Sequence, residues 1–141
     1  MSALSLRDEL PDGFFDPIFS ATEVADMLAL GGHALWVIEG EDGAVCAHLL
    51  VRVMEGAMAD ILSLYVVPEL RRRGYALRLM AALVPYAHAE GCVGIAMEVR
   101  ASNDAARALY GACGFEKVSI RKAYYTEPAE DAVVLALDLP S

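Results

Sequence analysis

The chain has 141 residues, the size of one domain, and its 57% hydrophobic and 22% charged residues exclude a disordered protein. Its longest uncharged apolar stretch, residues 27–38, is too short to span a bilayer. Arg7, Asp8 and Glu9 come too early for the apolar part of a secretory signal peptide. We therefore expect a single domain over residues 1–141, located in the cytoplasm and without a membrane partner.

The net charge of −9 argues against a nucleic-acid partner, because a phosphate backbone attracts the opposite sign. It suits a cationic substrate, such as an amine or a basic peptide. Arg71, Arg72, Arg73 and Arg78 depart from this balance, since they place four of the eleven basic residues within eight positions. The three cysteines and three histidines show no metal-ligand spacing, so we expect no metal site.

The order of hydrophobic patterns predicts an α/β (α+β) fold, with a mixed, mostly antiparallel central sheet flanked by helices. Ser20 and Glu23 form a capping box that begins the first helix, and Gly31 and Gly32 end it. The elements expected after it are strands at 34–39, 44–55 and 59–67, a helix at 75–89 with Pro85 as a kink or in its last turn, a strand at 93–100, a short helix capped by Asn103 or Asp104 and ending at Ala112, and strands at 116–124 and 132–139.

A basic, glycine-containing loop joins the third of these strands to the longer helix. Backbone N–H groups at a helix start have no partner within the helix, and the helix dipole favours anions there. Gly74 and Ala76 keep the loop small enough for a pyrophosphate to approach the backbone, and the arginines add positive charge. The residues alone leave a solvated basic helix start as an equal alternative.

The loop resembles the acetyl-CoA signature of the GNAT superfamily, Gln/Arg-x-x-Gly-x-Gly/Ala, with Arg71, Gly74 and Ala76 as the matching residues after Val-x-Pro at 66–68. The resemblance implies a GNAT fold, in which splayed strands form the slot for acetyl-CoA as co-substrate. The cofactor-binding residues that it implies are Leu64, Tyr65 and Val66 along the pantetheine arm, and Arg71, Arg72, Arg73, Gly74, Tyr75, Ala76 and Leu77 around the pyrophosphate.

Glu98 is a carboxylate in the middle of an apolar strand, and Tyr110 lies on the same side of the short helix as Asn103. A carboxylate withdrawn from water is a candidate general base. The residues alone favour more ordinary interpretations, with Glu98 on the solvent face of its strand and Tyr110 as a packing aromatic.

A second resemblance is to the bacterial N-acetyltransferases that modify the N-terminal alanine of a small-subunit ribosomal protein. The matching segments are Glu-Val-Arg-Ala-Ser-Asn at 98–103, Ala-Leu-Tyr at 108–110, Gly-Phe at 114–115, Arg-Lys-Ala-Tyr-Tyr at 121–125 and Glu-Asp-Ala at 130–132. This resemblance implies Glu98 as proton acceptor, Tyr110 as proton donor and Asn103 as a CoA contact. The expected reaction is direct acetyl transfer from the thioester to an amine, without a nucleophilic cysteine.

The beginning of the chain departs from that subfamily, whose members have a full first helix and then Pro-Trp-Ser. Here Pro11 and Gly13 limit any helix in residues 1–15, and the Trp before Ser20 is absent, although Phe19 is large enough for similar space. Because this region borders the acceptor site in the family, the acceptor stays open. The first expectation is transfer to a protein or peptide N-terminus, such as that of a ribosomal protein. The second is transfer to a small-molecule amine such as a polyamine or aminoglycoside, and the third is an acyl-CoA-binding module without catalysis.

Overall fold

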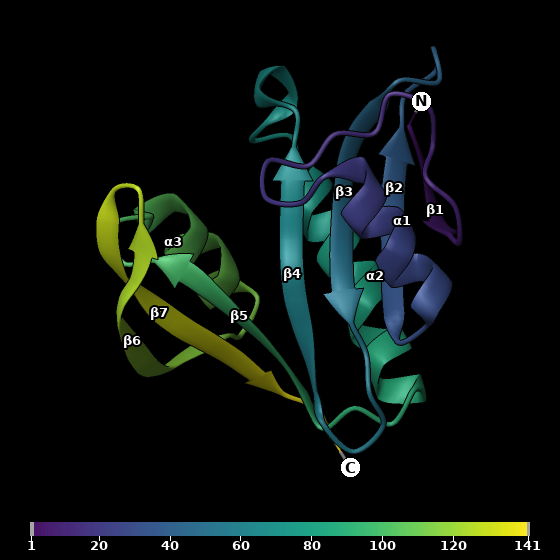
Figure 1. The fold of residues 1–141 in the computed structure, drawn as a ribbon. Helices are drawn as coiled ribbons and strands as arrows, with labels where there is room; N and C mark the ends of the chain where they lie inside the picture. The colour runs from purple at the N-terminus through teal and green to yellow at the C-terminus, as the bar shows by residue number, and fades with distance from the viewer. Residues whose placement is uncertain (1, 141) are drawn as a thin grey trace.

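The computed structural model describes residues 2–140, which form one seven-stranded sheet with helices on both faces (Figure 1). The strand order is β1-β2-β3-β4-β5-β7-β6, and every neighbouring pair is antiparallel except β4 and β5. The predicted fold class is confirmed. In chain order the elements are β1 (Ala3–Arg7), α1 (Ala21–Leu30), β2 (His33–Glu39), β3 (Val45–Arg52), β4 (Met58–Val66), the 3₁₀ turn η1 (Pro68–Leu70), α2 (Tyr75–Ala89), β5 (Gly94–Arg100), α3 (Asp104–Ala112), β6 (Glu116–Thr126) and β7 (Ala129–Asp138).

Helix α1 covers one face of the sheet and begins at the predicted capping box. The Ser20 side chain accepts from the Glu23 amide at 3.1 Å, and the Glu23 carboxylate accepts from the Ser20 amide at 3.0 Å. Gly31, at φ 84°, ends the helix as expected. The core on this face is Val24, Leu35, Val37 and Leu50.

Helices α2 and α3 cover the opposite face and share the larger core. Leu79, Met80, Leu83 and Ala87 of α2 are buried there. Pro85 lies four residues before the end of α2, close to the position that the sequence predicted, and its missing N–H leaves the carbonyl of residue 81 without a helical donor. No helix within residues 2–140 has the length and apolar character needed to cross a membrane.

Strands β4 and β5 pair only over the first three residues of each strand. They pair in parallel at Met58–Gly94, Ala59–Ile95 and Asp60–Ala96 and then part (Figure 1). Beyond this point β4 continues along β3 to Val66, and β5 continues along β7 to Arg100. The sheet therefore divides into two halves, and β4 has no β5 partner from residue 61 onward.

The sequence missed β1 and misjudged several ends. β1 is a five-residue edge strand on β2, too short for its apolar alternation at Leu4 and Leu6 to stand out. The strand expected at 44–55 ends at Arg52, because a turn closed by Ala57 N–H on Met54 C=O follows it. The last two strands are longer than predicted, since their pairing continues into a tight hairpin at its outer end.

Gly94 is sterically required where β4 and β5 meet. A Cβ there would lie 2.7 Å from the Leu137 carbonyl oxygen and 2.7 Å from the Met58 sulfur. We predict that Gly94→Ala lowers the free energy of unfolding by about 1–3 kcal/mol, as for other overpacked sites. Gly111→Ala is the control, because nothing lies within 4 Å of its Cβ position and Ala favours a helix. Urea unfolding of both variants measures the difference, and equal stabilities would contradict the steric account.

Candidate active site

The loop before α2 presents a run of free backbone N–H groups. Gly74 is the N-cap of α2 in the left-handed conformation, at φ 85°, and Arg72 is also left-handed, at φ 65°. Helical bonding begins with Arg78 N–H donating to Gly74 C=O at 3.1 Å. Within residues 2–140, the N–H groups of residues 72–77 donate to no acceptor, and no side chain caps α2. Such a run at the positive end of a helix dipole suits an anion.

Two of the clustered arginines have fixed positions in the fold. Arg71 Nε donates to the Val66 carbonyl at 3.0 Å, and its guanidinium lies 5.8 Å from the centroid of the Tyr65 ring. Arg78 Nη1 donates to Ser2 Oγ at 2.6 Å. Arg71 therefore ties the loop to the outer end of β4. Residues 72 and 73 are exposed on the loop.

The residues predicted for the pantetheine slot lie on the part of β4 that has left β5. Leu64 and Val66 pack against the larger core. Tyr65 points to the opposite face, where its ring contacts Phe15 and His48 at centroid distances of 5.7 and 5.8 Å. On the other side of the parting, Asn103 caps α3 by accepting from the Ala106 amide at 3.1 Å.

Glu98 lies in the outer half of β5 and is not buried among apolar side chains. Its side chain is 32% exposed, and Oε1 accepts from Arg121 Nη1 at 2.9 Å. Oε2 accepts from the Tyr124 hydroxyl at 3.4 Å. The residues alone favoured the solvent face of the strand for Glu98, and the partly exposed side chain agrees with that interpretation, because alternate side chains of β5 face opposite sides.

Tyr110 is buried in the larger core, on the face opposite Glu98. It is 6% exposed and packs edge-on against Phe115, with 5.9 Å between ring centroids. Burial raises the pKa of its hydroxyl to about 12, with a smaller contribution from Cys113. Met97 and Val99 share its core and flank Glu98 in the strand. Within residues 2–140 the hydroxyl has no hydrogen-bond partner.

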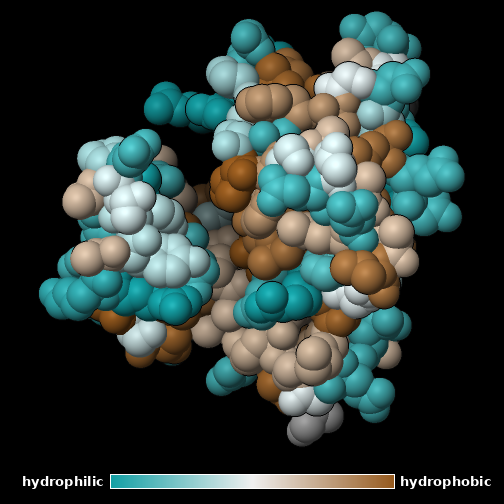
Figure 2. Space-filling model, viewed as in Figure 1, coloured by the Kyte–Doolittle hydropathy of each residue, from teal (hydrophilic) through white to brown (hydrophobic). Residues whose placement is uncertain are grey.

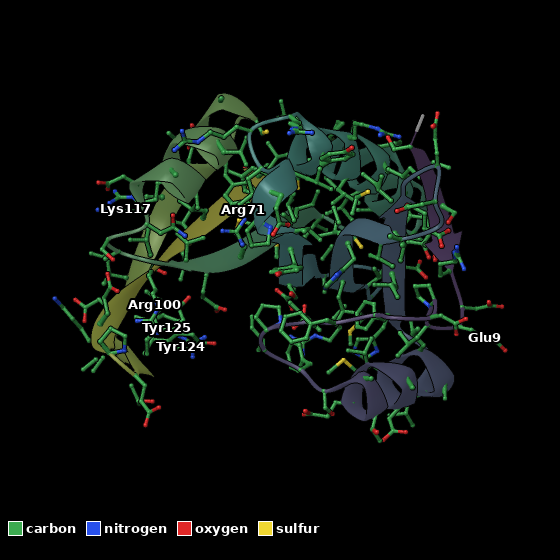
Figure 3. All side chains as sticks on the ribbon, turned by 90° about the horizontal axis from the view of Figure 1, so that it is seen from above. Glu9, Arg71, Arg100, Lys117, Tyr124 and Tyr125 are labelled. Carbon is green, nitrogen blue, oxygen red and sulfur yellow. The ribbon has the colours of Figure 1, made fainter. Side chains whose placement is uncertain are left out.

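Arg100 holds the β6–β7 hairpin and was not predicted as part of the site. Its guanidinium donates to the carbonyls of Pro128 and Glu127 at 2.9 and 3.1 Å and lies 4.3 Å from the Tyr125 ring centroid. Figure 3 shows Arg100, Tyr124 and Tyr125 together on the side of the hairpin toward the N-terminal half. These partners are distant in sequence, so no local pattern could have identified them.

Asp131 fills a bulge in the same hairpin. The register of β6 on β7 shifts between Arg121 and Tyr125, where Ala123 adopts φ 50°. Asp131 accepts from the Ala123 amide at 2.8 Å and from Lys122 Nζ at 3.3 Å. The segments 121–125 and 130–132, which the resemblance singled out separately, are therefore partners across one hairpin.

A cleft separates the two halves of the molecule where β4 and β5 have parted (Figure 2). One wall carries the outer end of β4 and the loop before α2, and the other carries the outer half of β5 and the β6–β7 hairpin (Figure 1). Glu98 belongs to this half of β5. In the described part of the chain, no three His, Cys, Asp or Glu side chains are grouped to hold a metal ion.

Residues 4–115 match the acetyltransferase (GNAT) family, and the chain belongs to this family. The ribosomal protein bS18-alanine N-acetyltransferase of Haemophilus ducreyi is 38% identical over 99 residues, which are 68% of this chain and 64% of that protein. The match thus spans just under two thirds of that relative.

Solved structures share the whole fold. The ribosomal-protein-S18-alanine N-acetyltransferase of Escherichia coli gives a TM-score of 0.80 at 25% identity, over 100% of this chain and 96% of that one. A GNAT family acetyltransferase from Elizabethkingia anophelis, solved with acetyl-CoA bound, gives 0.77 at 14% identity, over 96% and 98% of the two chains.

We predict that Gly74→Val abolishes CoA binding while the fold survives. No atom lies within 4 Å of its Cβ position, but φ is +85°, which a β-branched residue disfavours, so the free N–H groups would turn away. Gly43→Val is a matched control, with φ +80° and equal space in the β2–β3 turn. Isothermal titration with CoA compares them. Wild-type affinity in Gly74→Val would show that the anion binds elsewhere.

Proposed function

We propose that the protein transfers the acetyl group of acetyl-CoA to the N-terminal α-amine of a protein or peptide, with Glu98 as general base and Tyr110 as general acid. One observation carries the proposal. Glu98 belongs to the half of β5 that has parted from β4, and Tyr110 comes from α3. Their side chains lie on opposite faces of this half of β5. A thioester in the parting would meet a base on one side and an acid on the other.

The wall formed by the outer end of β4 and the loop before α2 matches the chemistry of the pyrophosphate and pantetheine of acetyl-CoA. The free N–H groups of residues 72–77 suit the pyrophosphate, with Arg72 and Arg73 adding charge. The open edge of β4 at residues 61–66 can pair with the pantetheine amides as a further strand would. Asn103 retains its side-chain NH₂ group as a donor, because only its oxygen caps α3.

Proton transfers accompany both bond changes. The neutral amine attacks the thioester carbon, and Glu98 accepts the amine proton directly or through water. Backbone N–H groups of the β4 edge near Val66 stabilise the oxyanion. As the C–S bond breaks, Tyr110 donates its proton to the departing thiolate, and the products are the acetylated amine and CoA. Burial keeps this hydroxyl protonated beforehand, since its pKa is raised to about 12.

Before an acceptor binds, the Arg121 guanidinium occupies the position on the Glu98 carboxylate that a substrate ammonium group would take. The side chains of Arg121 and Glu98 are 55% and 32% exposed, and an ion pair exposed to this extent is weak. A substrate ammonium group can therefore replace the guanidinium on the carboxylate. The bound ammonium group passes one proton to water, and Glu98 accepts the second proton as the amine attacks the thioester.

An α-amine is the acceptor that this chemistry favours. With a pKa of about 7.8 it is ~14% neutral at pH 7, whereas a lysine near ~10.4 is below ~0.1% neutral. The similar enzyme of Haemophilus ducreyi is named for the alanine of a ribosomal protein. The net charge of −9 would also draw in a basic protein. We therefore propose an N-terminal alanine, as in a ribosomal protein, as the acceptor.

We predict that Tyr110→Phe lowers turnover by ~10²–10⁴-fold, as expected when a general acid is lost, with little change in CoA affinity. The ring and its packing on Phe115 remain. Tyr86→Phe is the control, because it also removes one tyrosine hydroxyl. Tyr86 lies in α2, and its ring packs on Trp36 of β2. Steady-state kinetics with pre-steady-state confirmation of the chemical step provide the measurement. Unchanged turnover would return Tyr110 to a packing role.

We predict that an Ala-initiated peptide is acetylated at its α-amine and becomes inert when that amine is blocked, even with internal lysines present. Glu98→Gln should slow the reaction most at low pH and recover partly above pH ~8, where more of the amine is already neutral. Mass spectrometry locates the acetyl group, and a pH–rate profile tests the base.

Glu116→Gln controls for the lost charge, because Glu116 is exposed at the start of β6. It should leave the profile unchanged. Preference for spermidine or an aminoglycoside over every peptide would overturn the peptide acceptor. A Glu98→Gln variant with the wild-type profile would overturn the role of the base.

A further inference from the structure

The parting of β4 and β5 is closed at one end by two apolar side chains. Asp60 and Ala96 form the last pair of the parallel contact between the strands. Ile61 and Met97 follow them directly, so they are the first residues of the two strands beyond the pairing (Figure 1). Their side chains are 8% and 5% exposed and belong to the larger core, on the face covered by α2 and α3. Ile61 and Met97 thus form the closed end of the parting.

Both side chains of the closed end are supported from behind. Ile61 is paired with Val51 of β3, which is fully buried. Met97 is paired with Leu135 of β7, which is also buried in the larger core. Protein interiors are packed as densely as organic crystals, so neither side chain can move away from the parting without displacing a buried neighbour. The closed end therefore has a fixed depth.

The site that suits a pyrophosphate lies at the opposite end of the parting. The free N–H groups of residues 72–77 come after the outer end of β4, and the open edge of β4 runs from Val66 back to Ile61. A CoA molecule held by its pyrophosphate at this loop, and by its pantetheine amides along this edge, directs its acyl group toward the closed end. Tyr110, the proposed proton donor to the thiolate, packs in the same core as the closed end.

We propose that Ile61 and Met97 determine the length of the acyl chain that the protein accepts, so that acetyl-CoA binds and butyryl-CoA is disfavoured. This inference rests on the placement of acetyl-CoA in the proposed function. Each further methylene of an acyl chain must enter a volume that these two side chains already fill, and overpacking a dense core is unfavourable. A shorter side chain at either position leaves an apolar cavity, which stays dry and binds an apolar group.

The test measures the affinity of the protein for acetyl-CoA and butyryl-CoA by isothermal titration, without an acceptor. The wild type should bind butyryl-CoA at least about tenfold more weakly than acetyl-CoA. Met97→Ala should reduce this ratio about tenfold, because two methylenes can then be buried in the cavity. Circular dichroism establishes that each variant is folded.

Leu135→Ala is the matched control. Leu135 is opposite Met97 in the register, is equally buried at 5% exposed and lies in the same core. It belongs to β7, so β5 separates it from the parting. Its replacement makes a comparable cavity behind the closed end, and the ratio of the two affinities should stay within about twofold of the wild type.

A second pair of variants makes a smaller change, so that it also serves if Met97→Ala does not fold. Ile61→Val removes one methylene from the closed end, and such a change is mild in a core. It should improve the affinity for propionyl-CoA relative to acetyl-CoA about threefold. Ile38→Val makes the same chemical change in the same core, but in β2, two strands away from the parting, and should leave the ratio unchanged.

The outcomes separate this inference from the proposed function. Equal affinities of the wild type for acetyl-CoA and butyryl-CoA would overturn the inference. Unchanged ratios in the folded closed-end variants, or equal changes in their controls, would overturn it too. Since the titrations contain no acceptor, a wild type that shows the expected ratios but acetylates no peptide α-amine would overturn the proposed acceptor and leave the inference intact.

Discussion

The parallel contact between β4 and β5 ends after three residue pairs, although each strand continues along its other neighbour. Paired strands bury their backbone groups in a ladder, and an open edge exposes a row of N–H and C=O groups that accepts a further strand. In this protein the open edge lies inside the sheet, where β5 has parted from β4. It can serve a narrow ligand with amide groups, and the pantetheine arm of acetyl-CoA is such a ligand.

The two walls of the cleft differ in the chemistry that they offer. The β4 wall ends in free N–H groups and arginines, which suit phosphate. The β5 wall offers a carboxylate that already holds the guanidinium of Arg121, which suits an ammonium group. An anion and a cation are thus favoured on different walls of one cleft. The Tyr110 side chain lies on the opposite face of β5 from Glu98.

Local sequence patterns predicted the parts of the fold that depend on local physics. The Ser20 capping box, the helix at Tyr75–Ala89 and the Asn103 cap are where the sequence placed them, since each depends on residues a few positions apart. The surroundings of Glu98 were not predictable in this way. Arg121 is 23 residues from it in sequence, and only the pairing of β5 with β7 and of β7 with β6 brings them together.

The segment before α1 shows the same limit. The sequence indicated only that the helix and tryptophan of the similar enzymes are missing there. The carboxylate of Asp16 finds His48 and Ser63 on two strands, 32 and 47 residues away, and no short motif marks such a cluster. The roles of Glu98, Tyr110 and the loop at 72–77 rest on resemblance and geometry together, and remain predictions.

Amide chemical shifts during a titration with acetyl-CoA test the central claim most directly. If the open edge of β4 and the loop before α2 hold the cofactor, the largest ¹H–¹⁵N shift changes will fall on residues 61–66 and 72–77, and amide exchange there will slow. Shift changes confined to other surfaces, such as the β6 edge or α1, would contradict the account.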